Sequence, residues 1–229
     1  MNIFTILLKL LLYPSPKIEI FNEEKSQFDE IFERAMVKED RFIEYNLQIP
    51  KMKFIKYISH HKHLMLHGSN TNSIKVFEPK KQTLYNGTWT EAVFATRDPI
   101  WPVFYAVFQR QSLIKNFRNG CLTADGKKYY HFYSLNKQTV SNEPWTSGVL
   151  YFLPDKTFKQ SGGGRIQFDE WVSSEAVEPV LKLAVEPEDF YFLHKVSIHG
   201  ENESNLKTWL LYKLRNVFKR RTNNKGAHK

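Results

Sequence analysis

A histidine followed by a glycine, His67-Gly68-Ser69, stands at the end of the short apolar run Leu64–Leu66. Glycine has no side chain, so a ligand can approach its backbone N–H and C=O closely. One donor and one acceptor side by side suit a flat ring that carries a carboxamide, with the imidazole of His67 beside it. The alternative is a purely structural histidine at the end of a strand.

Two aromatic residues further along could hold such a ring between them. Phe94 lies in the apolar run Val93-Phe94-Ala95, and Tyr105 follows eleven residues later in a segment with helical spacing. Stacking of a ligand ring on aromatic side chains contributes about 0.5–1.5 kcal/mol beyond the burial of area. The alternative is that both rings belong to the core.

A carboxylate follows the glycine-rich stretch at residues 162–164. Asp169 and Glu170 are adjacent at the start of an expected strand, so their side chains point to opposite faces and one of them would face a cleft. A single carboxylate suits a transition state that resembles a sugar oxocarbenium ion, because it stabilises positive charge and holds the ribose 2′-OH. The alternative is a solvated acid.

The hydrophobic pattern indicates the elements that must position these groups. Between residues 51 and 199, short apolar runs alternate with turn residues, which favours an α+β domain with antiparallel sheets. Residues 99–113 have helical spacing, with Pro102 in the first turn. The expected strands contain residues 57–58, 64–66, 93–95, 149–153, 170–172, 180–185 and 190–192.

The two ends of the chain have helical periodicity instead. We divide the chain into an N-terminal helical segment (1–50), a core (51–200), and a C-terminal amphipathic helix with a basic tail (201–229). Leu206, Leu210, Leu214, Val217 and Phe218 form the apolar stripe of the last helix. The apolar run within residues 1–13 is too short to span a bilayer, so we expect no transmembrane segment.

Composition narrows the class of protein. The mean hydropathy of −0.48 and a charged fraction of 25% favour a soluble protein. The single cysteine, Cys121, excludes a disulfide framework and a cysteine-based zinc site, and fits a reducing compartment such as the cytoplasm. The net charge of +9 is concentrated beyond Lys213, where no acid occurs. Lys219, Arg220 and Arg221 are therefore candidates for contact with nucleic acid, the alternative being a solvated tail.

In their order and spacing, these elements resemble the ADP-ribosyltransferases of the diphtheria-toxin and poly(ADP-ribose) polymerase type. His67-Gly68-Ser69 matches the first motif of that family, and Phe94 and Tyr105 fall where two tyrosines are expected. Glu170 matches the last motif. The resemblance covers roughly residues 60–190 and implies split antiparallel β-sheets with flanking helices.

The resemblance also implies a mechanism with NAD as substrate. His67 would bind the adenosine ribose, and Gly68 together with Ser69 would border the nicotinamide carboxamide. The nicotinamide ring would lie between Phe94 and Tyr105, and Glu170 would stabilise the oxocarbenium ion. The expected function is a mono-ADP-ribosyltransferase, a glycosyltransferase that modifies a protein or nucleic-acid acceptor.

Two departures keep other functions open. Phe94 retains the ring of the expected tyrosine and lacks its hydroxyl, which favours a catalytically weak or inactive module that binds ADP-ribose or nucleic acid. An NAD glycohydrolase is a third hypothesis. Phe168 stands two residues before Glu170, where the arginine-modifying branch has an acid or glutamine, so arginine and asparagine are disfavoured as acceptors.

Other polar groups have simpler interpretations. His61, His63 and His67 would share a face of one strand, but neither a cysteine nor an acid completes the set, so we expect no metal. Arg97 is interpreted as an ion-pair partner of Asp98, with an NAD phosphate as the alternative. Arg165 lies in the glycine-rich loop, where acceptor contact is plausible.

Overall fold

A computed structural model describes residues 3–226, and the surroundings of side chains for residues 3–218. The helices are α1 (Ile3–Leu11), α2 (Asn22–Met36), α3 (Lys51–His61), α4 (Trp101–Val107), α5 (Lys137–Ser141) and α6 (Asn205–Gly226). The strands up to the middle of the chain are β1 (Tyr13–Pro14), β2 (Phe42–Ile43), β3 (Leu64–Ser69), β4 (Lys80–Thr83), β5 (Trp89–Ala95), β6 (Phe117–Thr123) and β7 (Tyr129–Asn136). They are followed by β8 (Gly148–Pro154), β9 (Lys159–Gln160), β10 (Gln167–Phe168), β11 (Trp171–Ser173), β12 (Leu181–Val185) and β13 (Ser197–His199).

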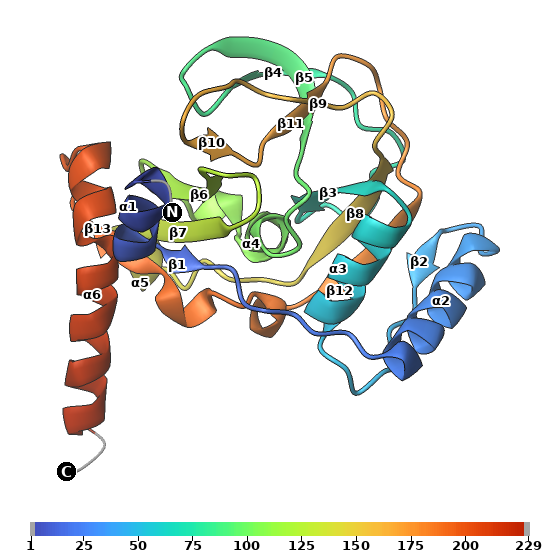
Figure 1. Cartoon of the computed structure of the whole chain (residues 1–229), viewed down its shortest axis with the longest axis horizontal. Helices are drawn as coiled ribbons and strands as arrows, with labels where there is room; N and C mark the ends of the chain where they lie inside the picture. The colour runs from blue at the N-terminus through green and yellow to red at the C-terminus, as the bar shows by residue number, and fades with distance from the viewer. Residues whose placement is uncertain (1–2, 227–229) are drawn as a thin grey trace.

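The described strands form three sheets, as Figure 1 shows. One has the order β1-β7-β6-β10 with β13 also on β7, the second is β4-β5-β11-β9, and the third is β2-β12-β8-β3. Most neighbours are antiparallel, which confirms the expected α+β class, and the pairs β2–β12 and β7–β13 are parallel. A bridge between Leu66 and Thr96 joins β3 of the third sheet to the end of β5 in the second.

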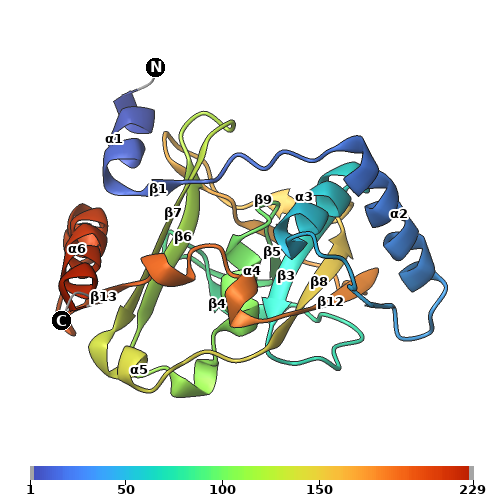
Figure 2. The ribbon, with the colours of Figure 1, turned by 90° about the horizontal axis from the view of Figure 1, so that it is seen from below.

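Helix α4 lies at the centre of the molecule, between the sheet that contains β6 and β7 and the sheet that contains β3 and β8 (Figure 2). Pro102 occupies its first turn as expected, and every residue except Tyr105 is buried. Gly68 allows this helix to pack against β3, because a Cβ there would lie 1.8 Å from the carbonyl oxygen of Pro102. Gly148 has the same role on β8, toward the carbonyl of Ala106.

Three expectations about local structure were wrong. Residues 57–58 belong to helix α3, whose buried Phe54, Ile55 and Ile58 have the spacing of a helical face. Residues 190–192 form turns in which the aromatic rings of Phe190 and Phe192 fill the core, so their hydrophobicity reflects burial rather than a strand. Residues 1–50 contain α1 and α2 but also supply β1 and β2 to two sheets, so this segment is not purely helical.

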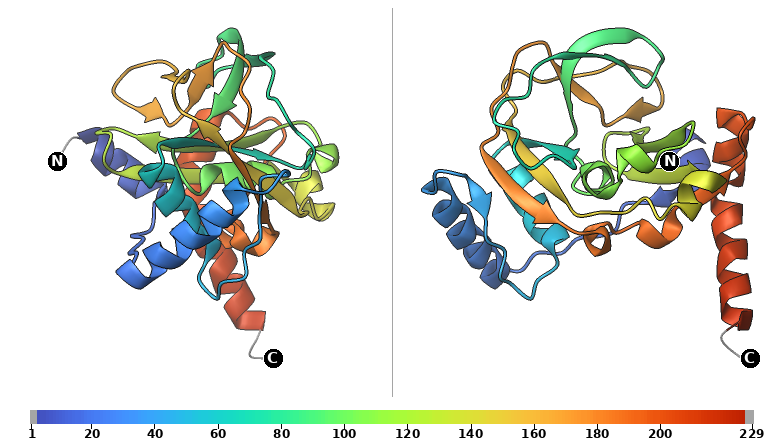
Figure 3. Two further views of the ribbon diagram at one scale, coloured as in Figure 1. Left: turned by 90° about the vertical axis from the view of Figure 1, so that its right-hand side faces the viewer. Right: turned by 180° about the vertical axis from the view of Figure 1, so that it is seen from behind.

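Helices α1 and α6 lie together at one end of the molecule, with α6 standing along its edge (Figure 3). The α6 helix is confirmed, but its apolar stripe faces outward, with Leu206 and Leu214 exposed, while Tyr212 is buried against the body. The side chains of Lys219, Arg220 and Arg221 lie outside the described residues. Among the helices described, none has the length and apolar character needed to cross a membrane.

Candidate functional site

His67 of β3 is bonded directly to the main chain of β5. Its Nδ1 lies 2.7 Å from the carbonyl oxygen of Phe94, which can only accept, so Nδ1 carries a proton and donates. Burial lowers the pKa of His67, and the bond to Phe94 opposes that shift in part. The imidazole is therefore neutral near pH 7, and its Nε2 carries a lone pair that can accept a hydrogen bond.

The backbone of Gly68 faces the edge of β3 where β5 ends. Leu66 exchanges both of its hydrogen bonds with Thr96, at 2.9 and 3.0 Å. Alternate residues of a strand direct their N–H and C=O toward the same edge, so Gly68 points to this edge while β8 occupies the other. A ligand would therefore reach the Gly68 backbone from the strand edge, and not across the missing side chain, because Pro102 fills that space.

Glu170 immediately precedes β11, which pairs with β5 so that Val172 lies opposite Phe94. Glu170 is two residues from Val172, so strand alternation, if continued beyond the first residue of β11, puts its side chain on the face of Phe94. Its Oε1 accepts a hydrogen bond from Ser161 Oγ at 2.6 Å and one from the Tyr85 N–H at 3.3 Å. Partial burial raises the pKa of this carboxyl, and these two donors oppose the rise.

Asp169, the neighbouring acid between β10 and β11, is buried. Its Oδ2 accepts from Thr96 Oγ1, Arg97 N and Asp98 N, and its Oδ1 accepts from the indole of Trp171. All four partners are donors, so Asp169 anchors the turn after β5. Of the two adjacent acids, Glu170 is the one that remains half-buried and accessible.

Tyr105 is the half-buried residue of α4. Burial raises the pKa of its hydroxyl, and among the weaker influences the charge of Glu170 raises it while that of Arg110 lowers it. The guanidinium of Arg110 lies 5.8 Å from the Tyr105 ring centroid, and its charge also lowers the pKa of His67. The charge of Arg110 thus acts on both Tyr105 and His67, and the charge of Glu170 acts on Tyr105.

Sequence reasoning missed Arg110 because it belongs to no motif. It is an exposed residue in the short 3₁₀ turn Arg110–Ser112 after α4. Lys80 of β4 is a second exposed cation whose charge acts on His67. The only indication in the sequence was a basic residue directly after the helix expected to contact the ligand ring. Basic residues are frequent in this sequence, so that feature does not single out Arg110.

The interpretation of Arg97 needs correction. Arg97 does not pair with Asp98: its guanidinium lies 4.3 Å from the Trp171 ring centroid and 3.6 Å from Asp155. Asp98 is buried instead, and its Oδ1 accepts the N–H groups at the start of α4. The guanidinium of Arg165 lies over the ring of Phe4, 5.5 Å from its centroid, so it contacts α1.

The histidine set considered for a metal is divided among different elements. His61 ends α3, where its ring stacks on Tyr57, and His63 occupies a turn with a φ of 54°. Because α3 is a helix, these residues do not share a strand face with His67. Phe168 stacks on Tyr85 with ring centroids 4.7 Å apart, so the position two residues before Glu170 is occupied by packed aromatic surface.

A surface hollow of about 760 Å³ lies elsewhere, and none of the candidate site residues lines it. Its lining consists of Lys38, Glu39, Asp40, Arg41, Lys75, Pro179 and Lys182. Comparisons with protein families, curated proteins and solved structures found no match to this chain. Function is therefore argued from the geometry of the site.

Proposed function

We propose that this chain is an NAD-dependent mono-ADP-ribosyltransferase that modifies a protein or nucleic-acid acceptor. The observation that carries the proposal is the junction of β3 and β5. There the His67–Phe94 bond lies next to the backbone of Gly68, and Glu170 immediately precedes β11, the strand that pairs with β5. Ser69 is the last residue of β3 and follows Gly68 directly.

Each group has a role that matches its surroundings. The N–H and C=O of Gly68 would hold the nicotinamide carboxamide, and the rings of Phe94 and Tyr105 would contact the nicotinamide ring. Nε2 of His67 would accept a hydrogen bond from the adenosine ribose. Arg110 and Lys80 supply positive charge near His67 for the two phosphates.

In the reaction, the bond between the ribose C1′ and the nicotinamide nitrogen breaks, and its electron pair leaves with nicotinamide. The carboxylate of Glu170 stabilises the positive charge on the ribose and holds the 2′-OH. A nucleophile of the acceptor then bonds to C1′ and loses its proton to solvent or a base. Partial burial of Glu170 strengthens this electrostatic stabilisation, because water screens it less.

A second candidate function is a module of the same fold that binds ADP-ribose or nucleic acid without turnover. Phe94 favours it, because the ring is kept while the hydroxyl of the expected tyrosine is absent. Glu170 favours the enzyme, because a binding module has no need of a half-buried carboxylate held by Ser161 and Tyr85.

The test uses NAD labelled in its adenosine part, incubated with the full chain and with DNA, RNA or cell lysate. Free nicotinamide and transfer of label are measured separately. Glu170→Gln should lower both by at least about a hundredfold while the protein stays folded, because the charge that stabilises the transition state is lost. Glu175→Gln, at an exposed acid beyond β11, is the matched control and should leave both unchanged.

The possible results separate the hypotheses. Transfer that depends on Glu170 supports the transferase. Nicotinamide release without transfer to any acceptor would indicate a glycohydrolase, and binding without release would indicate the module. If the wild-type chain neither binds nor consumes NAD, the proposal is wrong.

A further inference from the structure

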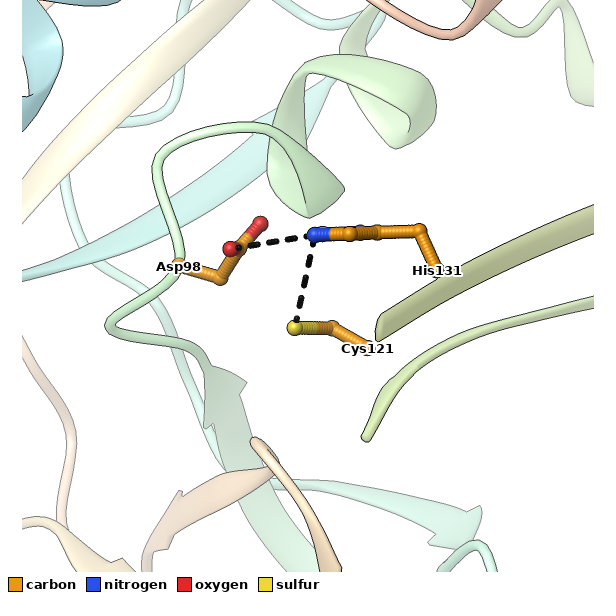
Figure 4. Close-up of side chains that lie close together, drawn as sticks. All are labelled: Asp98, Cys121 and His131. Carbon is orange, nitrogen blue, oxygen red and sulfur yellow. Dashed lines mark hydrogen bonds and ion pairs between the residues drawn. The ribbon is translucent and has the colours of Figure 1, made fainter. Parts of the chain in front are cut away.

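A second polar cluster, separate from the candidate NAD contacts, lies in the core beneath the turn that follows β5. It contains Asp98 from that turn, Cys121 from β6 and His131 from β7 (Figure 4). Their exposed fractions are 6%, 0% and 0%. Cys121 and His131 are directly paired across the two strands, so the β6–β7 register brings their side chains together.

The atoms of the three side chains that could bind a metal lie close together. Asp98 Oδ2 lies 3.5 Å from His131 Nε2, and Cys121 Sγ lies 3.9 Å from the same nitrogen. One ligand atom from each residue lies within 4.8 Å of both others. A carboxylate oxygen, a thiol sulfur and an imidazole nitrogen are all good ligands for a divalent metal.

The arrangement does not fit a catalytic triad. In a triad the acid and the nucleophile contact opposite nitrogens of the imidazole. Here both face Nε2, while Nδ1 lies 3.1 Å from the hydroxyl of Tyr133. Cys121 is also completely buried, so a substrate cannot reach its sulfur.

Two of the three groups are held in position by further hydrogen bonds. Asp98 Oδ1 accepts the N–H groups of Ile100 and Trp101, at 2.9 and 2.7 Å, which leaves Oδ2 directed at the cluster. The contact of His131 Nδ1 with Tyr133 leaves Nε2 as the nitrogen that faces Asp98 and Cys121. Partners of this kind orient the ligands of metal sites and set the histidine tautomer.

We propose that Asp98, Cys121 and His131 form a structural zinc site. Zinc–nitrogen and zinc–sulfur bonds of about 2.0 and 2.3 Å in tetrahedral geometry place neighbouring ligand atoms roughly 3.3–3.6 Å apart. The separation of 3.5 Å between Asp98 and His131 falls in that range, and that of 3.9 Å between Cys121 and His131 requires the sulfur to move only slightly. The thiol proton leaves to solvent when Zn²⁺ binds, so a thiolate and a carboxylate balance its charge.

Ser15 supplies the fourth position. Its Oγ lies 2.7 Å from His131 Nε2, and the residue is half-buried. The hydroxyl, or a water molecule bound to it, would complete the tetrahedron after a small shift away from the imidazole. This proposal replaces the expectation from the sequence that a single cysteine excludes a cysteine-based zinc site, because one thiolate is enough in a mixed set of ligands.

The proposed ion would stabilise the segments that carry Tyr105 and Glu170, because its ligand Asp98 bonds to both of them. Asp98 accepts the N–H groups at the start of α4, the helix that carries Tyr105. Its own N–H donates to Asp169 at 2.7 Å, next to Glu170. Zinc would therefore connect the start of α4 to β6 and β7. This role does not depend on which reaction, if any, the site catalyses.

The test begins with the full-length protein stripped of metal by a chelator and then titrated with Zn²⁺, or with Co²⁺ as a spectroscopic probe. We expect one ion per chain, a thiolate-to-cobalt charge-transfer absorption, and a higher melting temperature with Zn²⁺. Cys121→Ser should abolish that absorption and weaken Zn²⁺ binding at least tenfold. The double variant His61→Ala, His63→Ala removes the histidines near the end of α3 and should bind as the wild type does.

Several results would overturn the proposal. They are the absence of the cobalt absorption in the wild-type protein, unchanged Zn²⁺ affinity in Cys121→Ser, or loss of binding in the His61, His63 variant. If Cys121→Ser does not fold, two measurements on the wild-type protein decide the matter. They are its absorption spectrum with Co²⁺ and the rise in its melting temperature when Zn²⁺ is added.

Discussion

The imidazole Nδ1 of His67 lies 2.7 Å from the main-chain oxygen of Phe94, across the junction of two sheets. These two residues are separated by 27 positions in the chain and come from different sheets, joined by the bridge between Leu66 and Thr96. The bond fixes the tautomer of His67 and leaves Nε2 for a ligand. It also places the His67-Gly68-Ser69 motif next to Phe94.

The hydroxyl of Ser161 helps to keep Glu170 ionised. Partial burial raises the pKa of Glu170 above its ordinary value of 4.5, and the hydrogen bond from Ser161 opposes this rise. Turnover requires the carboxylate, so nicotinamide release should fall as the pH drops through that pKa. Ser161→Ala removes the donor, so the acidic limb of the pH–rate profile should move to higher pH.

Ser141→Ala, at an exposed position on α5, is the matched control and should leave the pH–rate profile in place. An acidic limb that is identical in Ser161→Ala and the wild type would show that Glu170 is not the group that titrates.

Gly68 is required by packing, independently of any ligand. A Cβ at this position would lie 1.8 Å from the carbonyl oxygen of Pro102, and a backbone atom cannot move aside easily. Gly68→Ala should therefore lower the free energy of unfolding by about 2–3 kcal/mol or more, measured by urea denaturation. Gly163→Ala should change it by less than about 0.5 kcal/mol, since no atom lies within 4 Å of a Cβ there. Equal stabilities of the two variants would contradict the close contact between α4 and β3.

Asp169 should tolerate even an isosteric change poorly. Both of its oxygens accept hydrogen bonds from donors, among them Thr96 and Trp171. In Asp169→Asn the negative charge is lost, and an amide NH₂ replaces one of the two accepting oxygens. In either orientation of the amide, this NH₂ faces a hydrogen-bond donor, so at least one hydrogen bond is lost. We expect a loss of about 2–3 kcal/mol in the free energy of unfolding, whereas Asp155→Asn, at a more exposed acid, should cost less than 1 kcal/mol. A stable Asp169→Asn variant would show that these bonds contribute little.

The Glu203–Arg215 pair anchors α6 and should make stability depend on acid pH. Two hydrogen bonds of 2.7 and 2.5 Å join the side chains. The pKa of Glu203 is lowered from 4.5 to about 2, mainly by the hydrogen bonds from Arg215 and to a smaller extent by that from Thr208. Because the folded-state pKa is depressed, the contribution is fully present above about pH 4.5 and is lost as the pH falls toward 2.

Glu203→Gln should cost roughly 1–2 kcal/mol at neutral pH, after allowance for screening by solvent, and the difference from wild type should shrink between pH 4.5 and 2. Thermal unfolding measured across this range is the appropriate experiment, with Glu201→Gln, at an exposed acid, as the control. A difference that stays constant with pH would argue against the ion pair.

Local pattern in the sequence determined much of the secondary structure. Pro102 and the apolar spacing after it identified α4, and the leucine stripe identified α6, because helical periodicity can be read within a short window. The antiparallel α+β class also followed from strands that are mostly not separated by helices. The same reasoning failed at residues 57–58, where a short apolar pair is compatible with either a strand or a helix.

Only the tertiary structure decided which side chains meet. The sequence singled out His67, Phe94 and Glu170, but the bond between the first two depends on the bridge between β3 and β5. Arg97 pairs with Asp155, and not with its neighbour Asp98, because the end of a strand turns adjacent side chains in different directions. Cys121 and His131 meet because their strands pair in one register, and long-range pairing of that kind is set by packing of the whole domain.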